Sequence, residues 1–181
     1  RNIGHKGIRM ESANGKTSVL IMNNNAEPYE GDFSEMPMEM RGEVSSGLGR
    51  AHIFMAQQHY QNQFKLVLEN SAWPGTLNID LFQDSTLDYK TLRIISGLDE
   101  GESKNGPESH RINGFERDGK SFGGATAFRA KISKDKVKWI DCAILIPDLT
   151  RHVKTAEIIS TSFLRESLPC KDGDEIHINL I

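Results

Sequence analysis

The sequence predicts a mainly β protein built as a small barrel, with short helices in its connections. Three observations favour this class. Many short runs alternate apolar and polar residues, turn signals such as Asp118-Gly119 recur between them, and only one segment has clear helical periodicity. A parallel α/β sheet would instead alternate its strands with helical segments of ten residues or more.

Residues 1–40 differ in composition from the rest of the chain. They hold an Asn23-Asn24-Asn25 run and a Met36-Pro37-Met38 segment, which are typical of linkers and loops. Asn14-Gly15 is a strong hairpin signal within this region. Because the chain starts at Arg1 rather than Met, we expect residues 1–40 to be an N-terminal extension or the remnant of an upstream domain. The barrel domain is expected over residues 41–181.

The first regular elements are a strand and a helix. The strand is predicted over residues 42–46 and ends at Gly47-Leu48-Gly49. The helix is predicted by apolar residues at positions i, i+4, i+7 and i+8, which share one helix face: Tyr60, Phe64, Val67 and Leu68. Phe54 and Met55 extend this face, and we interpret the whole stripe as core rather than as a ligand site.

The remaining elements are mostly strands. The segment from Thr76, TLNIDLF, alternates, whereas Leu92–Ile95 is a short apolar run before a loop over residues 97–110. A hairpin is predicted over Phe115–Phe122, turning at Asp118-Gly119. Further extended segments are expected at residues 125–132, 138–146, 157–159 and 175–180, with a helical turn at 163–168.

Composition limits the function. A chain of 181 residues that is 37% hydrophobic can bury a core, and no stretch approaches the roughly 20 apolar residues of a membrane span. The net charge of −3 gives no overall basic surface, so we expect no nucleic-acid binding by the barrel itself. Cys142 and Cys170 lack metal-ligand spacing and predict free thiols in a reduced, cytoplasmic protein.

The segment Trp73-Pro74-Gly75-Thr76-Leu77-Asn78 carries the clearest chemical signal. Pro74 and Gly75 favour a tight turn directly before the strand. In a strand, side chains at i and i+2 share a face, so Thr76 and Asn78 point the same way while Leu77 points into the core. Two adjacent neutral oxygens suit Mg²⁺, whose coordination is completed by phosphates and water. The alternative is a plain turn followed by an edge strand.

From Arg41 to the C-terminus the sequence resembles the archaeal-type CTP-dependent riboflavin kinases. The resemblance rests on the order and spacing of several short motifs: Gly-Glu-Val-Ser-Ser-Gly-Leu-Gly (42–49), Pro-Gly-Thr-Leu-Asn (74–78), Phe-Gly (122–123), Ile-Pro-x-x-Thr (146–150), Glu-Ile-Ile (157–159), Leu-Arg-Glu (164–166) and Lys-Asp-Gly-Asp (171–174). It implies a six-stranded cradle-loop barrel, related to the RIFT barrels. It also implies transfer of a phosphoryl group from CTP to the 5′-hydroxyl of riboflavin, giving FMN and CDP.

The resemblance also implies the site residues. The nucleotide-binding positions are Gly47, Leu48, Gly49, Arg50, Ala51 and His52, with a second segment at Ser162, Phe163, Leu164 and Arg165. Mg²⁺ is expected on Thr76 and Asn78, and flavin contacts on Thr150 and Glu157. No general base is assigned.

The glycine loop departs from the family pattern, Gly-x-Gly-Glu-Gly-Arg. Arg50 replaces an acid, Ala51 a glycine and His52 an arginine. If Ala51 had to adopt a positive φ, the strain would cost about 1 kcal/mol. The alternative function is therefore a non-catalytic flavin- or nucleotide-binding regulatory module. The retained Thr76 and Asn78 favour the kinase, since a flavin sensor needs no metal site. Nucleotide selectivity and oligomeric state stay open.

Overall fold

The computed structural model describes residues 7–11, 17–21, 38–103 and 106–181, and the chain divides into two compact units, residues 1–37 and 38–181. In the first unit, β1 (Gly7–Glu11) pairs antiparallel with β2 (Thr17–Ile21), with Glu11 opposite Thr17. This pairing confirms the hairpin expected around Asn14-Gly15, whose turn lies outside the described residues. The role of this unit stays a prediction.

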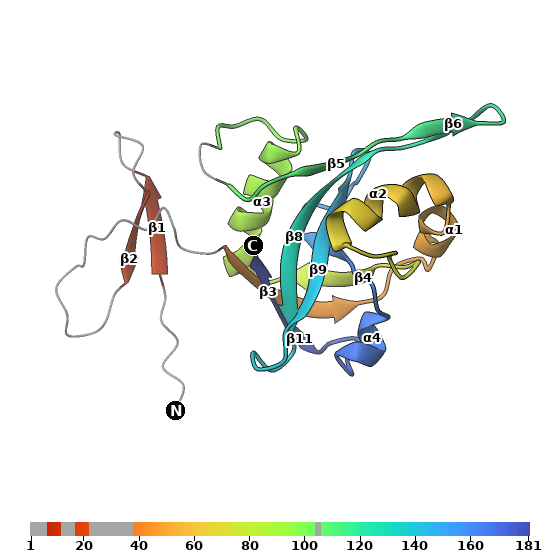
Figure 1. Ribbon diagram of the computed structural model, residues 1–181. Helices are drawn as coiled ribbons and strands as arrows, with labels where there is room; N and C mark the ends of the chain where they lie inside the picture. The colour runs from red at the N-terminus through yellow and green to blue at the C-terminus, as the bar shows by residue number, and fades with distance from the viewer. Residues whose placement is uncertain (1–6, 12–16, 22–37, 104–105) are drawn as a thin grey trace. The chain divides into compact units, whose positions relative to one another are not determined.

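The second unit is the expected barrel. Its strands are β3 (Glu39–Ser45), β4 (Leu77–Leu81), β5 (His110–Ile112), β6 (Phe115–Arg117), β7 (Lys120–Phe122), β8 (Ala125–Ser133), β9 (Ile140–Pro147), β10 (Thr155–Ile159) and β11 (Glu175–Leu180). Six of them form a closed antiparallel ring in the order β11-β3-β4-β10-β9-β8, and β8 returns to β11 (Figure 1). The predicted six-stranded barrel is therefore confirmed.

The long strand β8 explains why the sheet has a seventh member. Its second half, Ala130–Ser133, pairs with β11 and closes the ring, whereas its first half, Ala125–Ala127, pairs with β5. Beyond β5 the chain continues into the β6–β7 hairpin, which Figure 1 shows projecting from the barrel. Asp118 and Gly119 take positive φ values of 53° and 72° at its tip, as the turn signal predicted.

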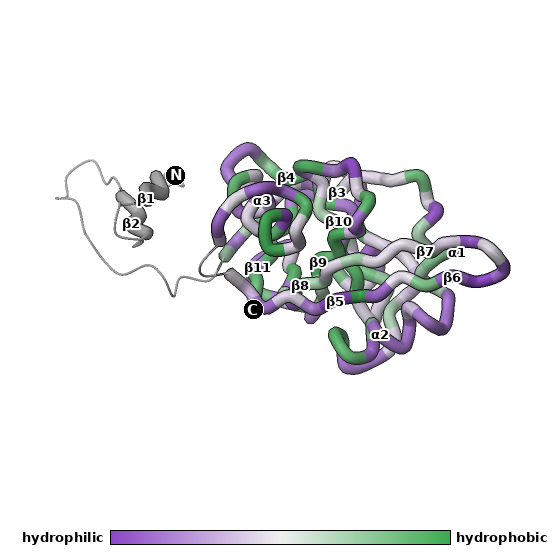
Figure 2. The backbone as a smooth tube through the Cα atoms, turned by 90° about the horizontal axis from the view of Figure 1, so that it is seen from above, coloured by the Kyte–Doolittle hydropathy of each residue, from purple (hydrophilic) through white to green (hydrophobic). Residues whose placement is uncertain are grey.

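Alternation within the strands separates the barrel interior from its outer surface. In β3, Met40, Gly42 and Val44 are buried while Glu39, Arg41 and Glu43 are exposed. The interior is filled by aliphatic and aromatic side chains from every strand of the ring, among them Ile79, Phe128, Ile144, Ile158 and Ile178. Figure 2 shows the contrast between these apolar strands and the hydrophilic α2 (Gln58–Leu68).

Within the described part of the barrel unit, four α-helices connect the strands. The short helix α1 (Ala51–Met55) precedes α2, which packs against β5, β8 and β9 through a second apolar cluster outside the barrel. The turn η1 (Gln83–Ser85) leads into α3 (Thr86–Ile95), and α4 (Leu164–Ser167) precedes β11. The sequence predicted α2 and α4 but not α3. Its pattern indicated only a short apolar run over residues 92–95, the last turn of that helix.

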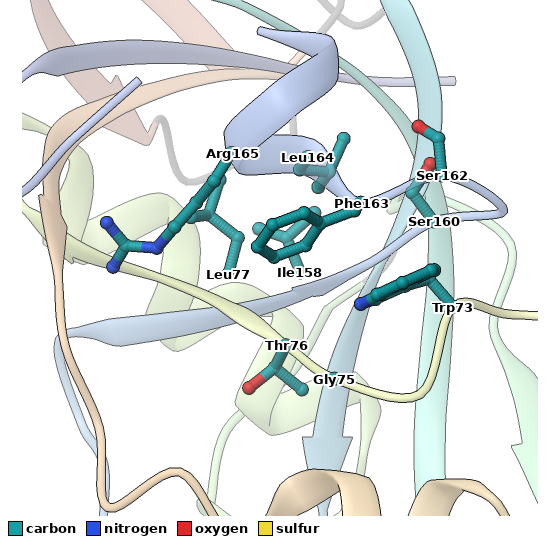
Figure 3. Close-up of a pocket in the computed structure, with 10 residues that line it drawn as sticks. All are labelled: Trp73, Gly75, Thr76, Leu77, Ile158, Ser160, Ser162, Phe163, Leu164 and Arg165. Atoms are coloured by element: carbon teal, nitrogen blue, oxygen red, sulfur yellow. The ribbon is translucent and has the colours of Figure 1, made fainter. Parts of the chain in front are cut away.

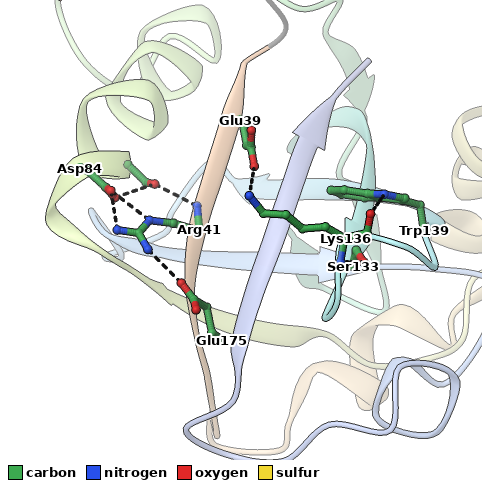
Figure 4. Close-up of polar contacts among 8 residues, drawn as sticks. Glu39, Arg41, Asp84, Ser133, Lys136, Trp139 and Glu175 are labelled. Atoms are coloured by element: carbon green, nitrogen blue, oxygen red, sulfur yellow. Dashed lines mark hydrogen bonds and ion pairs between the residues drawn. The ribbon is translucent and has the colours of Figure 1, made fainter. Parts of the chain in front are cut away.

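Ion pairs on the outer surface join β3 to its neighbours (Figure 4). The Arg41 guanidinium forms ion pairs with the carboxylates of Asp84, within η1, and Glu175, in β11, at 2.8 and 2.9 Å. Both carboxylates raise the pKa of Arg41, with the hydrogen bond to Asp84 the larger cause. These exposed pairs contribute little free energy individually, about 0 to 1 kcal/mol each, so the interior packing stabilises the ring.

Candidate active site

Thr76 and Asn78 lie on one face of the chain where β4 begins. The strand starts at Leu77, one residue later than expected, and the Leu77 side chain is buried in the barrel. The Thr76 hydroxyl donates a hydrogen bond to Asn78 Oδ1 over 3.1 Å, and both residues are half-buried. The structure thus gives the predicted convergence of two neutral oxygens on one side of the strand.

The glycine loop approaches this pair from the end of β3. A Cβ built on Gly47 would lie 2.7 Å from Asn78 Nδ2, so only glycine allows the loop backbone this close to the amide. The amide nitrogen of Asn78 faces Gly47, whereas its oxygen accepts the hydrogen bond from Thr76. The Gly47 backbone therefore packs directly against the Asn78 amide.

Ala51 does not adopt a positive φ, so the backbone strain considered for this position is absent. Ala51 is the first residue of α1, Arg50 before it has φ −98°, and the positive φ of the loop falls on Gly49 at 69°. The His52 Nδ1 lies 2.8 Å from the Gly49 carbonyl oxygen and closes the loop. Leu48 is 88% exposed, so its side chain belongs to none of the buried clusters. The altered residues Arg50-Ala51-His52 are compatible with an unstrained loop.

Strand register brings the predicted metal and flavin residues together. Asn78 is opposite Glu157 in β10 on one side and opposite Ser45 in β3 on the other. Residues directly opposite in an antiparallel pair share a face with Cβ atoms about 4.5–5.5 Å apart. Glu157, 79 residues from Asn78 in the chain, is therefore its immediate neighbour on the outer surface of the barrel.

Glu157 and Thr76 line a cavity with a volume of about 640 Å³. Its walls come from α1, α2 and the ends of β5, β8 and β9, and they combine apolar with polar groups: Ala51, Phe54, Met55, Tyr60, Phe64, Thr76, Ile112, Gly123, Gly124, Ala125, Leu145, Pro147, Leu149, Thr150, Arg151, His152 and Glu157. A mostly apolar cavity of this size with a few polar groups is typical of small-molecule sites.

Several of these residues were missed by sequence reasoning. The helical stripe with Phe54, Met55, Tyr60 and Phe64 was interpreted as core, and most of it is buried, yet it also forms the cavity wall. The Tyr60 hydroxyl donates to the Gly123 carbonyl oxygen over 2.6 Å and so fixes the ring at the cavity edge. His152 also lines the cavity and lies close enough to Glu157 to affect its electrostatics.

Burial raises the pKa of Glu157 above its usual range, and His152 partly offsets this effect. A carboxyl group in this environment gains from any hydrogen-bond donor that a ligand brings, because its charge is poorly solvated. Glu157 is thus suited to bind a polar N–H or O–H group at the boundary between the cavity and Asn78.

The loop that carries Thr150 is held at both ends by arginine–aspartate pairs. Arg111 of β5 makes two hydrogen bonds to the carboxylate of Asp148. Arg93 of α3, largely buried, makes two to Asp99 and donates a third to the His152 carbonyl oxygen over 2.7 Å. Within the loop, the His152 N–H donates to Thr150 Oγ1 over 3.2 Å. Side chains of β5 and α3 therefore anchor this loop to the rest of the barrel unit.

The second predicted nucleotide segment, Ser162–Arg165, lines a smaller cavity of about 40 Å³ (Figure 3). Thr76 lines both cavities and so connects them. Arg165 Nη2 bonds Asp172 Oδ1 at 2.7 Å, and the other oxygen of this carboxylate accepts from the Ser46 hydroxyl over 2.6 Å. Arg165 thereby links α4 to the start of the glycine loop. Asp172-Gly173-Asp174 is the turn before β11, as expected.

Three further findings concern site classes. Over the described part of the chain, no helix is long and apolar enough to cross a membrane. The same residues contain no group of three or more His, Cys, Asp or Glu side chains arranged for a metal ion. Cys142 and Cys170 are both free and buried, as the spacing predicted, and burial raises the pKa of each thiol.

Comparison with known proteins gives consistent matches. A family model named CTP-dep_RFKase and described as "Domain of unknown function DUF120" matches residues 44–180. A riboflavin kinase of Haloquadratum walsbyi is 33% identical over 151 residues, which are 83% of this chain and 59% of the relative. Riboflavin kinases of Saccharolobus solfataricus and Sulfurisphaera tokodaii are each 33% identical, over 79% of this chain and 74% and 95% of their own lengths.

The extent of these matches decides what they show. The chain spans about three fifths of the length of the Haloquadratum relative and of a Methanosarcina acetivorans riboflavin kinase, which is 31% identical. The family model, by contrast, covers nearly all of the barrel unit, including the glycine loop and the segments with Thr76, Asn78, Thr150 and Glu157. The chain therefore belongs to the CTP-dependent riboflavin kinase family.

Proposed function

We propose that this chain is a riboflavin kinase that transfers the terminal phosphoryl group of CTP to the 5′-hydroxyl of riboflavin, giving FMN and CDP. The observation that carries the proposal is the pairing of Asn78 with Glu157 at the edge of the 640 Å³ cavity. A kinase must bring its acceptor hydroxyl in line with the terminal phosphate of the donor. Here a residue suited to the metal adjoins one suited to the flavin.

The large cavity is the proposed flavin site. Phe54, Met55 and Tyr60 offer an apolar wall for the isoalloxazine ring. The hydroxyl of Thr150 can donate or accept, whereas the carboxylate of Glu157 accepts from a ring N–H or a ribityl hydroxyl. Because the loop around Thr150 is anchored by Arg93 and Arg111, less conformational entropy of the loop is lost when a ligand binds.

The donor nucleotide is proposed to bind across Gly47–His52 and Ser162–Arg165. Backbone N–H groups of the glycine loop can face phosphate oxygens, and Gly49, where a Cβ would meet nothing within 4 Å, leaves room for them to approach. Arg165 supplies a guanidinium at the junction of the two segments, held by Asp172. The exposed Arg50 adds a second cation near the loop.

Mg²⁺ is the proposed cofactor, and Thr76 and Asn78 fit it. Their two oxygens lie 3.1 Å apart and face one direction, and the Gly47 backbone, where a Cβ would collide, leaves the amide free to hold that orientation. When bound, the metal would neutralise charge on the donor phosphates. The chain's own contribution is to position the donor and the acceptor hydroxyl, which is the main requirement of phosphoryl transfer.

The alternative of a non-catalytic binding module rested on the altered glycine loop. An unstrained Ala51 within α1 removes part of that argument. The deciding experiment is an assay of FMN formation from riboflavin with Mg²⁺, offering CTP, ATP, GTP and UTP separately. Preferential use of CTP supports the proposal. Preference for another nucleotide would retain the kinase and change its donor. Flavin binding without FMN from any donor would favour the binding module.

A further inference from the structure

Two aromatic rings stack on each other beside the small cavity. Trp73, in the turn before β4, and Phe163, directly before α4, have ring centroids 5.2 Å apart and planes inclined by 29°. The backbone N–H of Trp73 donates to the Ser160 carbonyl oxygen over 2.8 Å, which ties the turn before β4 to the segment that follows β10. Trp73 is 46% exposed and Phe163 37% exposed, so a substantial part of each ring faces solvent.

The pair adjoins the groups proposed to hold the donor phosphates. The cavity that both rings line also includes Thr76 and Arg165 (Figure 3). A nucleotide whose phosphates lie at Thr76 can reach the rings with its base, because Trp73 is only three residues from Thr76 across a tight turn. Figure 3 shows the indole nitrogen of Trp73 turned toward the cavity.

The size of the cavity determines how a base can bind there. A volume of about 40 Å³ is close to the space of one water molecule, and a pyrimidine ring does not fit inside. The exposed ring faces are the remaining surface. Aromatic side chains bind nucleobases by stacking, which tolerates any base because every base has a π-face. An isoalloxazine ring, by contrast, has ample room in the larger cavity.

We propose that Trp73, together with Phe163, is the platform on which the nucleobase of the phosphoryl donor stacks. This inference rests on the proposed kinase function and adds a base-binding residue from outside the two nucleotide segments. Stacking supplies affinity without reading the base edge. The platform therefore holds the donor in place, and selection between bases comes from polar groups around it.

Tryptophan fluorescence offers a direct test, because the chain has two tryptophans. The other, Trp139, lies in the β8–β9 connection, where its indole N–H donates to the Lys136 carbonyl oxygen over 3.1 Å (Figure 4). In a Trp139→Phe variant, Trp73 is the only emitter. Titration with CDP and Mg²⁺ should quench its emission saturably, whereas pyrophosphate, which lacks a base, should not. Calorimetry with CDP reports binding independently of the fluorescence.

Kinetics provide the second test. Trp73→Leu should raise the KM for CTP on the order of tenfold to hundredfold, the range expected for one lost stacking contact. The KM for riboflavin should not change, and the preference for CTP over UTP should change less than about threefold. Trp73→Phe should restore most of the affinity, and Trp139→Leu, the matched control, should leave the KM for CTP unchanged.

The outcomes separate this inference from the proposed function. FMN formation with calorimetric CDP binding but unquenched Trp73 would overturn the platform and leave the kinase intact. A rise in the KM for riboflavin instead of CTP would also overturn it. Absence of both FMN formation and CDP binding in the unsubstituted chain would overturn the two proposals together.

Discussion

The substitution Gly47→Ala tests whether the glycine loop and Asn78 act as one unit. A Cβ at position 47 would lie 2.7 Å from Asn78 Nδ2, whereas ordinary contacts begin at about 3.4 Å. Either the loop or the amide must therefore move by about 0.7 Å. A displacement approaching 1 Å at a positioning group can cost on the order of a hundredfold in rate, or about 2.7 kcal/mol of activation free energy. We expect the turnover of FMN formation to fall by this amount.

A double-mutant cycle identifies the cause. The turnover of Gly47→Ala, Asn78→Ala and the double variant is measured with saturating CTP and riboflavin. In the Asn78→Ala background the new methyl group no longer meets the amide, so Gly47→Ala should lower turnover there by less than about threefold. Strong non-additivity of this kind is expected only for groups in contact.

Gly119→Ala is the matched control for stability. Gly119 has φ 72° at the tip of the β6–β7 hairpin, and a Cβ there would meet nothing within 4 Å. Strain in the left-handed region should lower the free energy of unfolding by about 1 kcal/mol without lowering turnover. The reasoning is refuted if Gly47→Ala keeps turnover within about threefold of the unsubstituted chain, or if its cost is the same in both backgrounds.

Three further predictions concern the metal, the loop and the core. Asn78→Ala should reduce turnover far more than riboflavin affinity, measured by flavin titration, and equal losses would argue against a metal-ligand role. The Arg93 hydrogen bonds hold the pKa of Asp99 below its usual 3.8, so their stabilisation is complete above that pH and lost as pH falls through the lowered pKa. Asp99→Asn should therefore be less stable than the unsubstituted chain at neutral pH, by thermal denaturation, with the difference shrinking below about pH 4; a constant difference would contradict this. Phe128→Ala removes a fully buried ring and should lower the free energy of unfolding, measured with urea, by about 3–5 kcal/mol. A loss of less than about 1 kcal/mol would mean that the interior repacks around the missing ring.

Local patterns were sufficient to predict most strands. The last strand, Glu175–Leu180, has the predicted bounds, and the Asp118-Gly119 turn adopts the positive φ values that its sequence favours. Such elements depend on neighbouring residues alone. Helix α3 was missed for a physical reason: its buried side includes Arg93, whose charge is satisfied by Asp99 and the His152 carbonyl. A hydrophobic pattern cannot show a buried charge, because its partners lie outside the helix: Asp99 follows α3, and His152 is 59 residues away.

The cavity could not be predicted from local patterns either. Its walls come from α1, α2 and four strands, β5, β8, β9 and β10, and they meet only when the barrel has closed through the β8–β11 pairing. Tyr60 and Phe64 have the spacing and burial of core residues, and in most proteins that is all such residues do. Nothing in their spacing distinguishes a filled core from one that leaves about 640 Å³ open.

The placement of Asn78, in contrast, was predictable because the core enforces it. Leu77 and Ile79 are buried in the barrel on either side of Asn78. A register slip of one residue would turn Asn78 inward and expose Ile79, which costs both a buried polar group and lost apolar burial. The same alternation in β10 buries Ala156 and Ile158 and leaves Glu157 on the outer face. Interior packing of β4 and β10 therefore fixes the Asn78–Glu157 pairing. Substitutions of these two outward-facing residues should consequently lower activity without lowering stability.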